Sequence, residues 1–208
     1  MGVSVRTSAP SRTVAAVLAE TWLLAKHAPS LRCEHADEHG VVLRGPGVGG
    51  LTVSVADGVI EAGESALAAW LTEVAARAER LDEAPHVVGA AIIADGAVLA
   101  AQRSYPPELA GRWEFPGGRV EAGETEETAV IREIREELGV TVRVTGRVGP
   151  DLILPNGWVL RIHAAELVDG RPDALEHHAL RWVGAAELTS LDWLDADRAV
   201  LPAIRAQL

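Results

Sequence analysis

The chain has very little cysteine, lysine, phenylalanine and tyrosine. Cys33 is the single cysteine, so an internal disulfide is excluded, and we expect a buried, unreactive thiol in a reducing compartment. Only Lys26 among the 19 basic residues is a lysine, and 30 acidic residues outnumber them, for a net charge of −11. Because such a chain repels nucleic-acid backbones and anionic membranes, neither is expected as the main partner.

Long apolar runs are also lacking, so a membrane-spanning segment is not expected. The apolar stretch near the start is interrupted by Glu20 and precedes no clean cleavage site, and Arg6 stands where a myristoylation pattern needs a hydroxyl residue. We therefore expect a cytoplasmic protein. With 208 residues, 48% of them hydrophobic, the chain can form one large domain or two small ones with a packed core.

Residues 1–85 are expected to form a small domain of α-β-β-β-α order. A first helix is predicted over about residues 11–26, and a second begins near Ser65 as the N-cap. One face of the second helix is apolar: Leu67, Trp70, Leu71, Val74, Ala75, Ala78 and Leu81. Alternating stretches between the helices and a turn at Asp57-Gly58 predict three short strands. A role of this unit in homodimer contacts, or as a lid on an active site, stays open.

Residues 86–208 are expected to form a second domain, because a charged segment that ends in Pro85 separates the two parts. A strand pair around a turn at Asp95-Gly96 comes first. A loop, a glutamate-rich helix, strands near 141–148, 157–166 and 179–183, and an apolar C-terminal helix follow. This order predicts an α/β (α+β) fold in which a mixed sheet carries helices on its faces.

The glutamate-rich segment Gly117–Val140 holds seven glutamates and three arginines. Good helix formers fill Thr125–Leu138, Glu126 and Glu127 suit the positive end of the helix dipole, and Gly139 ends the helix. A helix is therefore predicted from Thr125 to Leu138.

Three glutamates of this helix fall within about 100° of arc: Glu133, Glu136 and Glu137. A solvated acidic face is the ordinary interpretation of such a run. Like charges four residues apart repel, however, and a divalent cation would compensate that repulsion. Gly117 and Gly118 upstream allow a backbone carbonyl to approach a ligand closely. Carboxylate and carbonyl oxygens suit Mg²⁺ or Mn²⁺ rather than zinc.

The same segment resembles the signature of the Nudix hydrolases, G-x5-E-x7-R-E-U-x-E-E-x-G-U, in which U is aliphatic. Every specified position is met: Gly118, Glu124, Arg132, Glu133, Ile134, Glu136, Glu137, Gly139 and Val140. The resemblance implies a loop-helix-loop that holds Mg²⁺ against the phosphates of a nucleoside diphosphate derivative, so that water cleaves a phosphoanhydride bond. The implied metal ligands are Glu133, Glu136, Glu137 and the Gly117 carbonyl. The resemblance further implies that Glu124 and Arg132 brace the loop, and that Glu133 or Glu176 is the general base.

Residues 86–208 resemble the MutT-like branch, which cleaves nucleoside triphosphates to the monophosphate and pyrophosphate. The stretch WEFPGG is similar to that branch, and Arg103 falls where it places an arginine on the substrate phosphates; a solvated strand end is the alternative. The stretch EHHALRWV implies Glu176 as a further metal ligand from a second loop. His177 and His178 are expected to be solvated, and His163 to pack within a strand.

Asp197 falls where MutT-like enzymes place a polar residue against the base, an asparagine in those that prefer oxidised guanine. A carboxylate accepts hydrogen bonds and so suits the amino group of cytosine, whereas capping of the C-terminal helix is the alternative. Guanine-preferring relatives stack the base on an aromatic residue where this chain has Leu154. Trp113 and Trp158 are the candidates to replace it.

The sequence thus predicts a Mg²⁺-dependent nucleoside triphosphate pyrophosphohydrolase that sanitises the nucleotide pool and favours dCTP, CTP or modified cytosine nucleotides. Three alternatives stay open. They are an 8-oxo-dGTP pyrophosphatase, a hydrolase of another nucleoside diphosphate derivative, and a nucleotide-sensing regulator in which residues 1–85 act on a partner. Because those residues include seven basic and eleven acidic side chains, DNA is a poor candidate for that partner.

Overall fold

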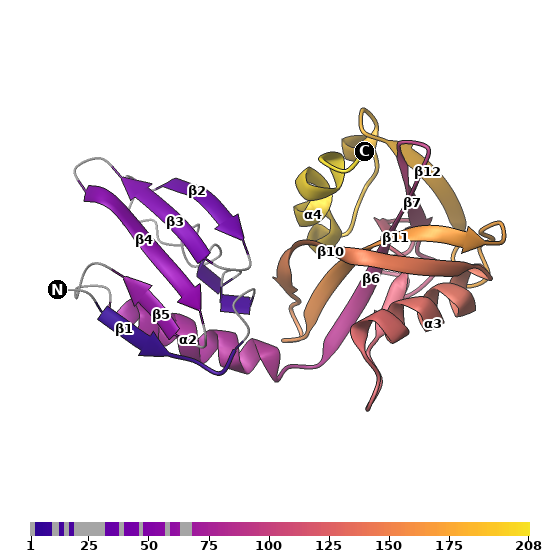
Figure 1. Ribbon diagram of the computed structural model, residues 1–208. Coiled ribbons are helices and arrows are strands. Elements are labelled where there is room, and N and C mark those ends of the chain that lie inside the picture. The colour runs from indigo at the N-terminus through magenta and orange to yellow at the C-terminus, as the bar shows by residue number, and fades with distance from the viewer. Residues whose placement is uncertain are drawn as a thin grey trace. The chain divides into compact units, whose positions relative to one another are not determined.

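The computed structural model describes residues 3–9, 13–14, 17–18, 32–37, 40–45, 48–56, 59–62 and 68–208. The chain divides into two compact units, Met1–Ala84 and Pro85–Leu208, each with its own sheet (Figure 1). Within the described ranges, no helix combines the length and the apolar character that crossing a membrane requires.

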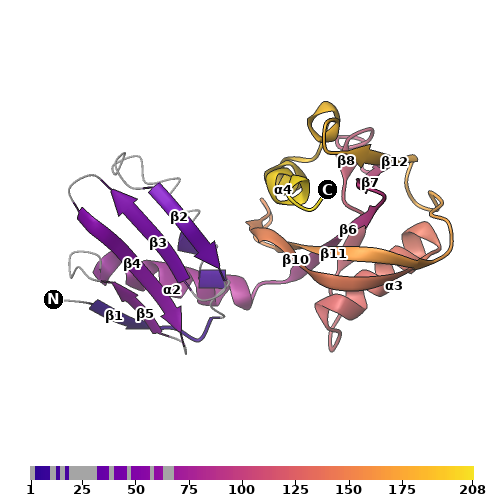
Figure 2. The same cartoon turned by 45° about the horizontal axis from the view of Figure 1, so that its top comes forward.

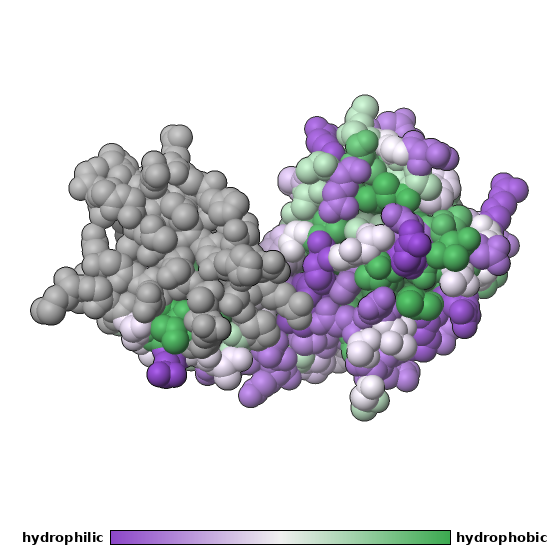
Figure 3. Space-filling view, viewed as in Figure 1, coloured by the Kyte–Doolittle hydropathy of each residue, from purple (hydrophilic) through white to green (hydrophobic). Residues whose placement is uncertain are grey.

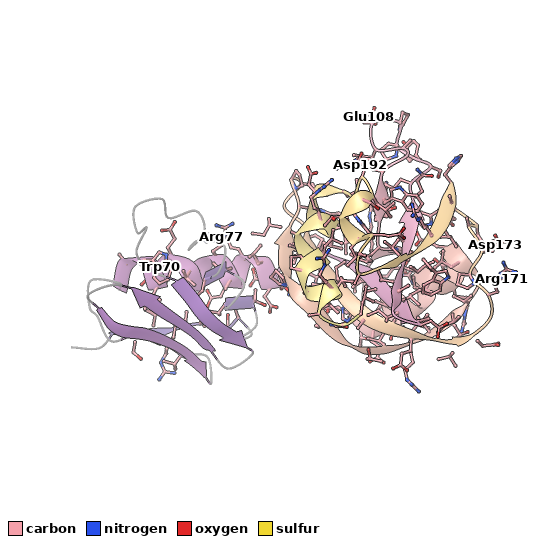
Figure 4. The ribbon with its side chains drawn as sticks, turned by 90° about the horizontal axis from the view of Figure 1, so that it is seen from above. Trp70, Arg77, Glu108, Arg171, Asp173 and Asp192 are labelled. Carbon is pink, nitrogen blue, oxygen red and sulfur yellow. The ribbon has the colours of Figure 1, made fainter. Side chains whose placement is uncertain are left out.

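The first unit contains an antiparallel sheet in the order β1-β5-β4-β3-β2. Its strands are β1 (Val3–Arg6), β2 (Arg32–Asp37), β3 (Gly40–Gly45), β4 (Val48–Ala56) and β5 (Val59–Ala62). Helix α2 (Ala68–Asp82) packs against β1, and Figure 4 labels Trp70 and Arg77 on it. Its buried residues are Leu71, Val74, Ala75, Ala78 and Leu81, so the predicted apolar face is confirmed from Leu71 onward, whereas Trp70 is partly buried and Leu67 lies outside the described residues.

The described residues of this unit form five strands, whereas the sequence predicts three. The additional strands, β1 and β2, lie at the two edges of the sheet. An edge strand pairs on one side only, and a strand as short as Val3–Arg6 gives too few residues for a periodic signal. The predicted first helix is helical at 13–14 and 17–18. Its remainder, Ser65, the Asp57-Gly58 turn and the side chain of Cys33 lie outside the described residues.

The second unit is a mixed sheet between two helices, with strand order β10-β11-β6-β7-β12 (Figures 1 and 2). Its strands are β6 (His86–Ala94), β7 (Ala97–Gln102), β8 (Trp113–Glu114), β9 (Gly117–Arg119), β10 (Thr141–Ile153), β11 (Val159–Asp169) and β12 (Ala179–Gly184). Strands β11 and β6 are parallel, and the other neighbouring pairs are antiparallel. The predicted fold class, a mixed sheet sandwiched between helices, is confirmed.

Helix α3 (Glu126–Leu138) covers one face of this sheet, and α4 (Asp195–Arg205), preceded by the 3₁₀ turn η2 (Leu188–Ser190), covers the other (Figure 2). The side chain of Thr125 caps α3 by accepting a hydrogen bond from the Thr128 N–H at 3.2 Å. Gly139 ends the helix at a φ of 68°. The predicted end at Leu138 is confirmed, and the helix begins one residue later than predicted, because Thr125 is its N-cap.

Each helix covers its own apolar core. The core under α3 includes Val88, Ala90, Val130, Ile134 and Leu138. The core under α4 includes Phe115, Ile162, Leu188, Trp193, Val200 and Ile204. All these residues belong to the second unit.

Strands β6 and β7 pair only beside the turn that joins them. This turn has Asp95 and Gly96 at φ 50° and 72°, the left-handed geometry predicted for it. Beyond the turn the two strands diverge, β9 pairs with β6, and β8 pairs with β7. Residues 113–119 therefore lie between the separated strands, next to the C-terminal half of α3.

Candidate active site

Arg132 of α3 joins the helix to the loop before it. Its guanidinium donates to both carboxylate oxygens of Glu124, at 3.0 and 2.9 Å, and to the Arg119 carbonyl at 2.9 Å. These bonds from Arg132 lower the pKa of Glu124, and the same pair raises the pKa of Arg132. A bidentate pair of this kind has a single geometry, so it holds the loop against the helix.

Two glycines allow this loop to approach β6 and α3 closely. A Cβ atom at Gly117 would lie 2.1 Å from the carbonyl oxygen of Val88, and one at Gly118 would lie 2.3 Å from a carboxylate oxygen of Glu133. The Gly117 N–H donates to Glu137 at 2.9 Å. At Gly117 the clash is with the backbone of β6, so only glycine fits there, whereas the clash at Gly118 is with the movable end of the Glu133 side chain.

Glu133, Glu136 and Glu137 are the donors that α3 offers to a cation. The side chain of Glu136 is half exposed, whereas Glu133 is largely buried and lies 2.9 Å from Arg132. Burial raises the pKa of Glu137 to about 7; the neighbouring Glu114 and Glu133 carboxylates also raise it, and His177 and the Gly117 N–H lower it. Carboxylates that disfavour each other's charge are stabilised by a divalent cation.

The donor set of this region fits a hard divalent cation such as Mg²⁺. It consists of carboxylate oxygens beside a glycine cradle that would admit a backbone carbonyl. Within residues 68–208 and the other described ranges, no three acidic or histidine side chains already converge on one point. A bound cation would therefore have to draw the carboxylates together.

An open pocket of about 170 Å³ lies beside Glu137. Its lining residues are Arg103, Ser104, Tyr105, Glu114, Glu137, Glu176 and His177. They come from the end of β7, from β8, from α3 and from the loop before β12, and Figure 4 shows Glu108 projecting from the tip of the loop that follows Arg103. The fold thus brings Arg103 and Glu176, both predicted site residues, to Glu137.

Two residues of this pocket carry contacts that the sequence did not indicate. Glu114, with 13% of its side chain exposed, forms an ion pair with Arg103 and accepts a bond from His177 Nε2 at 3.3 Å. The expectation that His177 is solvated is wrong, because its side chain is only 6% exposed; His178 is exposed, as expected. Burial lowers the pKa of His177, but the hydrogen bond to Glu114 and the charge of Glu137 outweigh it, so the pKa is raised.

The contact between Glu114 and His177 could not be read from the sequence. Glu114 belongs to the two-residue strand β8, which is too short to show a period, and its position follows from pairing with Ala101 of β7. His177 lies in a charged loop, where a histidine is usually solvated. The one available signal was an acidic residue inside the otherwise apolar and glycine-rich stretch WEFPGG.

Asp197 is buried beneath the start of α4. It is the third residue of the helix, whose N-cap is Leu194, and its carboxylate accepts the Phe115 N–H at 2.9 Å. Burial raises its pKa to about 7, the charge of Glu114 adds to this effect, and the Phe115 N–H opposes it. Asp197 is therefore not the N-cap, and its carboxylate links α4 to the segment that leads to Gly117.

The candidate base-stacking residues lie outside the pocket lining. Trp113 and Leu154 pack against the core under α4, and Trp113 forms a backbone bridge with Trp193. Trp158 lies under the guanidinium of Arg119, 4.7 Å from it. In this structure neither tryptophan lies among the residues around Glu137.

A second charged cluster, the Glu126 network, anchors the start of α3 to β10 and β11. Its members are Glu126, Arg147, Asp151, Arg161 and His163. Glu126 contacts Arg161, and both Arg147 and His163 lie 3.1 Å from it. Burial alone would raise the pKa of Glu126, but the bonds from His163 and Arg161 hold it well below its ordinary value. His163 is buried, as expected, and its ring makes a polar contact with Glu126. Glu126 therefore has side-chain partners in addition to the helix dipole.

The face of the second unit in Figure 3 mixes hydrophilic residues with smaller hydrophobic areas. The large hydrophobic side chains that remain exposed in the described part of the chain are Tyr105, Val168, Leu175 and Trp182. Of these, Tyr105 lines the pocket.

Comparisons with known proteins agree with this architecture. The model of the NUDIX domain matches residues 84–204. The chain is 53% identical over 115 residues to the putative 8-oxo-dGTP diphosphatase 2 of Mycobacterium tuberculosis, which is 54% of this chain and 82% of that protein. It is 38% identical over 122 residues to the CTP pyrophosphohydrolase of Escherichia coli, 58% of this chain and 90% of that protein. The solution structure of the E. coli ORF135 protein is similar with a TM-score of 0.52 at 38% identity, over 59% of this chain and 89% of that one.

Proposed function

Because the chain belongs to the NUDIX family and is a Nudix hydrolase, we propose that it cleaves nucleoside triphosphates to the monophosphate and pyrophosphate. The names of its similar relatives, a putative 8-oxo-dGTP diphosphatase and a CTP pyrophosphohydrolase, support this reaction. The observation that carries the proposal is the pocket in which the Arg103 guanidinium lies beside the carboxylates of Glu137 and Glu176. A guanidinium group is well suited to bind phosphate.

In the proposed reaction, each residue has a distinct task. Glu133, Glu136, Glu137, Glu176 and the Gly117 carbonyl hold a divalent cation, Mg²⁺ or Mn²⁺. When bound, the cation neutralises charge on the phosphoryl oxygens and acidifies water. Arg103 donates hydrogen bonds to the phosphates. Glu124 and Arg132 keep the loop at Gly117 in place, as their bidentate contact allows. Glu133 or Glu176 accepts the proton of the attacking water.

The proposed base is cytosine, in dCTP, CTP or a modified cytosine nucleotide. The support is the buried Asp197, whose ionised carboxylate suits the cytosine amino group. A pKa of about 7 also gives Asp197 a protonated form, which donates a hydrogen bond to a carbonyl oxygen. The second candidate is 8-oxo-dGTP, which is named in the description of the similar M. tuberculosis protein.

A panel of nucleotides with Mg²⁺ tests the reaction and the base together. The expected result is release of pyrophosphate from triphosphates, with the highest kcat/KM for a cytosine nucleotide. Preference for 8-oxo-dGTP would move the assignment to the second candidate. Turnover confined to nucleoside diphosphate sugars or dinucleotides would refute triphosphate cleavage, and no turnover of any nucleotide would favour a nucleotide-sensing regulator.

A Glu137→Gln variant tests the carboxylate side of the pocket. We expect it to lose activity by about 100-fold or more while it stays folded, because the amide keeps an acceptor for the Gly117 N–H but binds a cation poorly. A matched control is Glu127→Gln, which changes an exposed glutamate of the same helix. Equal activity of the two variants would remove Glu137 from the site.

We further propose that the substrate is a free nucleotide in the cytoplasm and not a nucleic acid. The net charge of −11 disfavours a polynucleotide partner, whereas a small anion can bind through a cation. A filter-binding assay at low salt, with single- and double-stranded oligonucleotides, is expected to show no retention.

A further inference from the structure

Glu114 has both carboxylate oxygens engaged at the wall of the pocket. Oε2 forms the ion pair with Arg103, and Oε1 lies 3.3 Å from Nε2 of His177. A largely buried carboxylate is stable only where such partners compensate its loss of water. Arg103 and His177 together fix the orientation of the Glu114 carboxylate.

Arg103 depends on Glu114 for its own orientation. Its Nη1 group binds Glu114, and its Nε–H donates to the Tyr105 carbonyl at 3.0 Å. Within the described part of the chain, Nη2 forms no hydrogen bond to the protein, so it is available to a phosphate oxygen. Release of Glu114 would leave the guanidinium one anchor in place of two.

His177 is held in place by the backbone around it. Its ring is buried, and Nδ1 has no hydrogen-bond partner among the described residues, so the contact with Glu114 is its one hydrogen bond there. Three hydrogen bonds fix the neighbouring residues: Leu175 N–H to the Glu137 carbonyl at 3.0 Å, Ser104 hydroxyl to the Glu176 carbonyl at 2.7 Å, and His178 N–H to the Gln102 carbonyl at 2.8 Å. The loop thus presents the imidazole to Glu114 without needing the ring for its own structure.

We propose that His177 is a positioning residue for phosphate binding. It holds the carboxylate of Glu114 against Arg103, so that Arg103 keeps its guanidinium at the pocket and Glu114 stays apart from the carboxylates of α3. This inference rests on the proposed function, because the partner it assigns to Arg103 is the phosphate chain of the substrate.

Three variants of the full-length chain separate this role from a structural one. His177→Leu removes the donor to Glu114, His177→Gln keeps a donor at a similar reach, and His178→Leu changes the exposed neighbour as a control. We expect His177→Leu to raise KM for the best triphosphate by about tenfold with a smaller change in kcat, because a ground-state contact is weakened. The His177→Gln and His178→Leu variants are expected to stay within about threefold of the parent.

A double-mutant cycle with Arg103→Ala tests whether His177 acts through Arg103. If it does, His177→Leu has no further effect on kcat/KM once Arg103 is absent. Multiplying effects of the two substitutions would overturn the proposal. It would equally be overturned by a His177→Leu variant with unchanged KM, or by a His177→Gln variant as impaired as His177→Leu.

Calorimetric binding of inorganic tripolyphosphate with Mg²⁺ separates this inference from the proposed function. If the parent protein cleaves no triphosphate but binds tripolyphosphate, and His177→Leu weakens that binding by about tenfold while His178→Leu does not, the reaction is wrong and the positioning role stands. Equal binding by the parent and His177→Leu refutes the role whatever the reaction. Thermal unfolding of each variant identifies any loss that arises from unfolding, and the His177→Gln variant then provides the comparison.

Discussion

At Asp197, a carboxyl group that is ionised in water at neutral pH is 4% exposed and has a pKa raised to about 7 by burial. The backbone donors of Phe115 and of Asp197 itself do not offset the lost hydration. The ionised form is therefore costly to the folded protein, and the position resembles functional sites, at which perturbed carboxyls are common.

The Asp197→Asn variant tests this cost through the pH dependence of stability. The ordinary pKa of an aspartate is about 3.9, so the folded state binds the proton more tightly, and stability falls as the pH rises from about 4 to 7. Asparagine keeps the acceptor for Phe115 and carries no charge. Relative to the parent, the variant should gain on the order of 3 kcal/mol between pH 4 and pH 8, measured by denaturant unfolding. A constant difference at both pH values would contradict the assignment.

Gly117 offers a second test at the scale of one residue. Its Cα lies so close to β6 that a methyl group would meet the Val88 carbonyl at 2.1 Å, and its φ is 151°. We expect Gly117→Ala to lower the free energy of unfolding by on the order of 3 kcal/mol and to abolish activity. The control is Gly146→Ala on β10, where the methyl group meets nothing within 4 Å and the change should be under about 1 kcal/mol. Equal losses would show that the close approach is not required.

At the scale of the element, α3 is fixed at its first turn and at its middle by different interactions. The Glu126 network holds its first turn to β10 and β11, and Arg132 and Glu124 hold its middle to the loop. The apolar residues of α3 determine only which face of the helix is buried. Because polar partners at these two points fix the rotation and translation of α3, the glutamates of its second half occupy defined positions beside Gly117.

Glu126→Gln should therefore destabilise the protein far more than Glu127→Gln, its neighbour in the same turn. Removal of one charge leaves two arginines, Arg147 and Arg161, to share the carboxylate of Asp151, and this uncompensated charge costs about 3 kcal/mol. Glu127 is exposed, so its substitution should cost less than about 0.5 kcal/mol. Chemical denaturation at pH 7 measures both values.

The stability difference between the parent and Glu126→Gln is also predicted to depend on pH. The pKa of Glu126 lies below its ordinary value in the folded state, so its stabilisation is full above the unfolded pKa of about 4.3 and is lost as the pH falls below it. The difference between the parent and Glu126→Gln should shrink in acid. A difference that grows as the pH falls would refute the network as described.

Elements whose apolar residues recur at a regular spacing could be predicted from the sequence. Elements without such a spacing could not. The sequence predicts α3 and the apolar face of α2, because each spans several turns with one buried side. Strand β1 was missed because it is four residues long and its partner β5 lies far along the chain, and β2 was missed because its residues, RCEHAD, show no regular apolar alternation. The two-residue strand β8, and with it the position of Glu114, exists only through its pairing with β7.

At the scale of the whole molecule, the candidate site belongs to one unit. Every residue that lines the pocket, and both cores under α3 and α4, lies between residues 85 and 208. The NUDIX domain model matches residues 84–204, which is about this part of the chain. Residues 1–84 are therefore not expected to supply catalytic groups.

A chain of residues 85–208 alone should keep the activity of the full protein. Because the site and its cores are internal to this unit, we expect kcat/KM for the best nucleotide within about threefold of the full-length value. The full-length protein, assayed alongside, provides the reference. A loss of more than about 100-fold in a folded fragment would assign the first unit a part in catalysis, as a lid or a dimer contact.

The sequence by itself determined the chemistry of this protein. The spacing of Glu133, Glu136 and Glu137 on one helix, and the glycines before it, predict a site for a hard cation, because helix periodicity and glycine geometry are local properties. Only the tertiary structure decided which distant groups meet this site. Arg103, Glu114 and His177 come together because strand pairing and a backbone-anchored loop bring separate segments to one pocket, and long-range pairing leaves no periodic mark in the sequence. For the same reason, the buried Glu126 network became visible only where β10 and β11 pass under the start of α3.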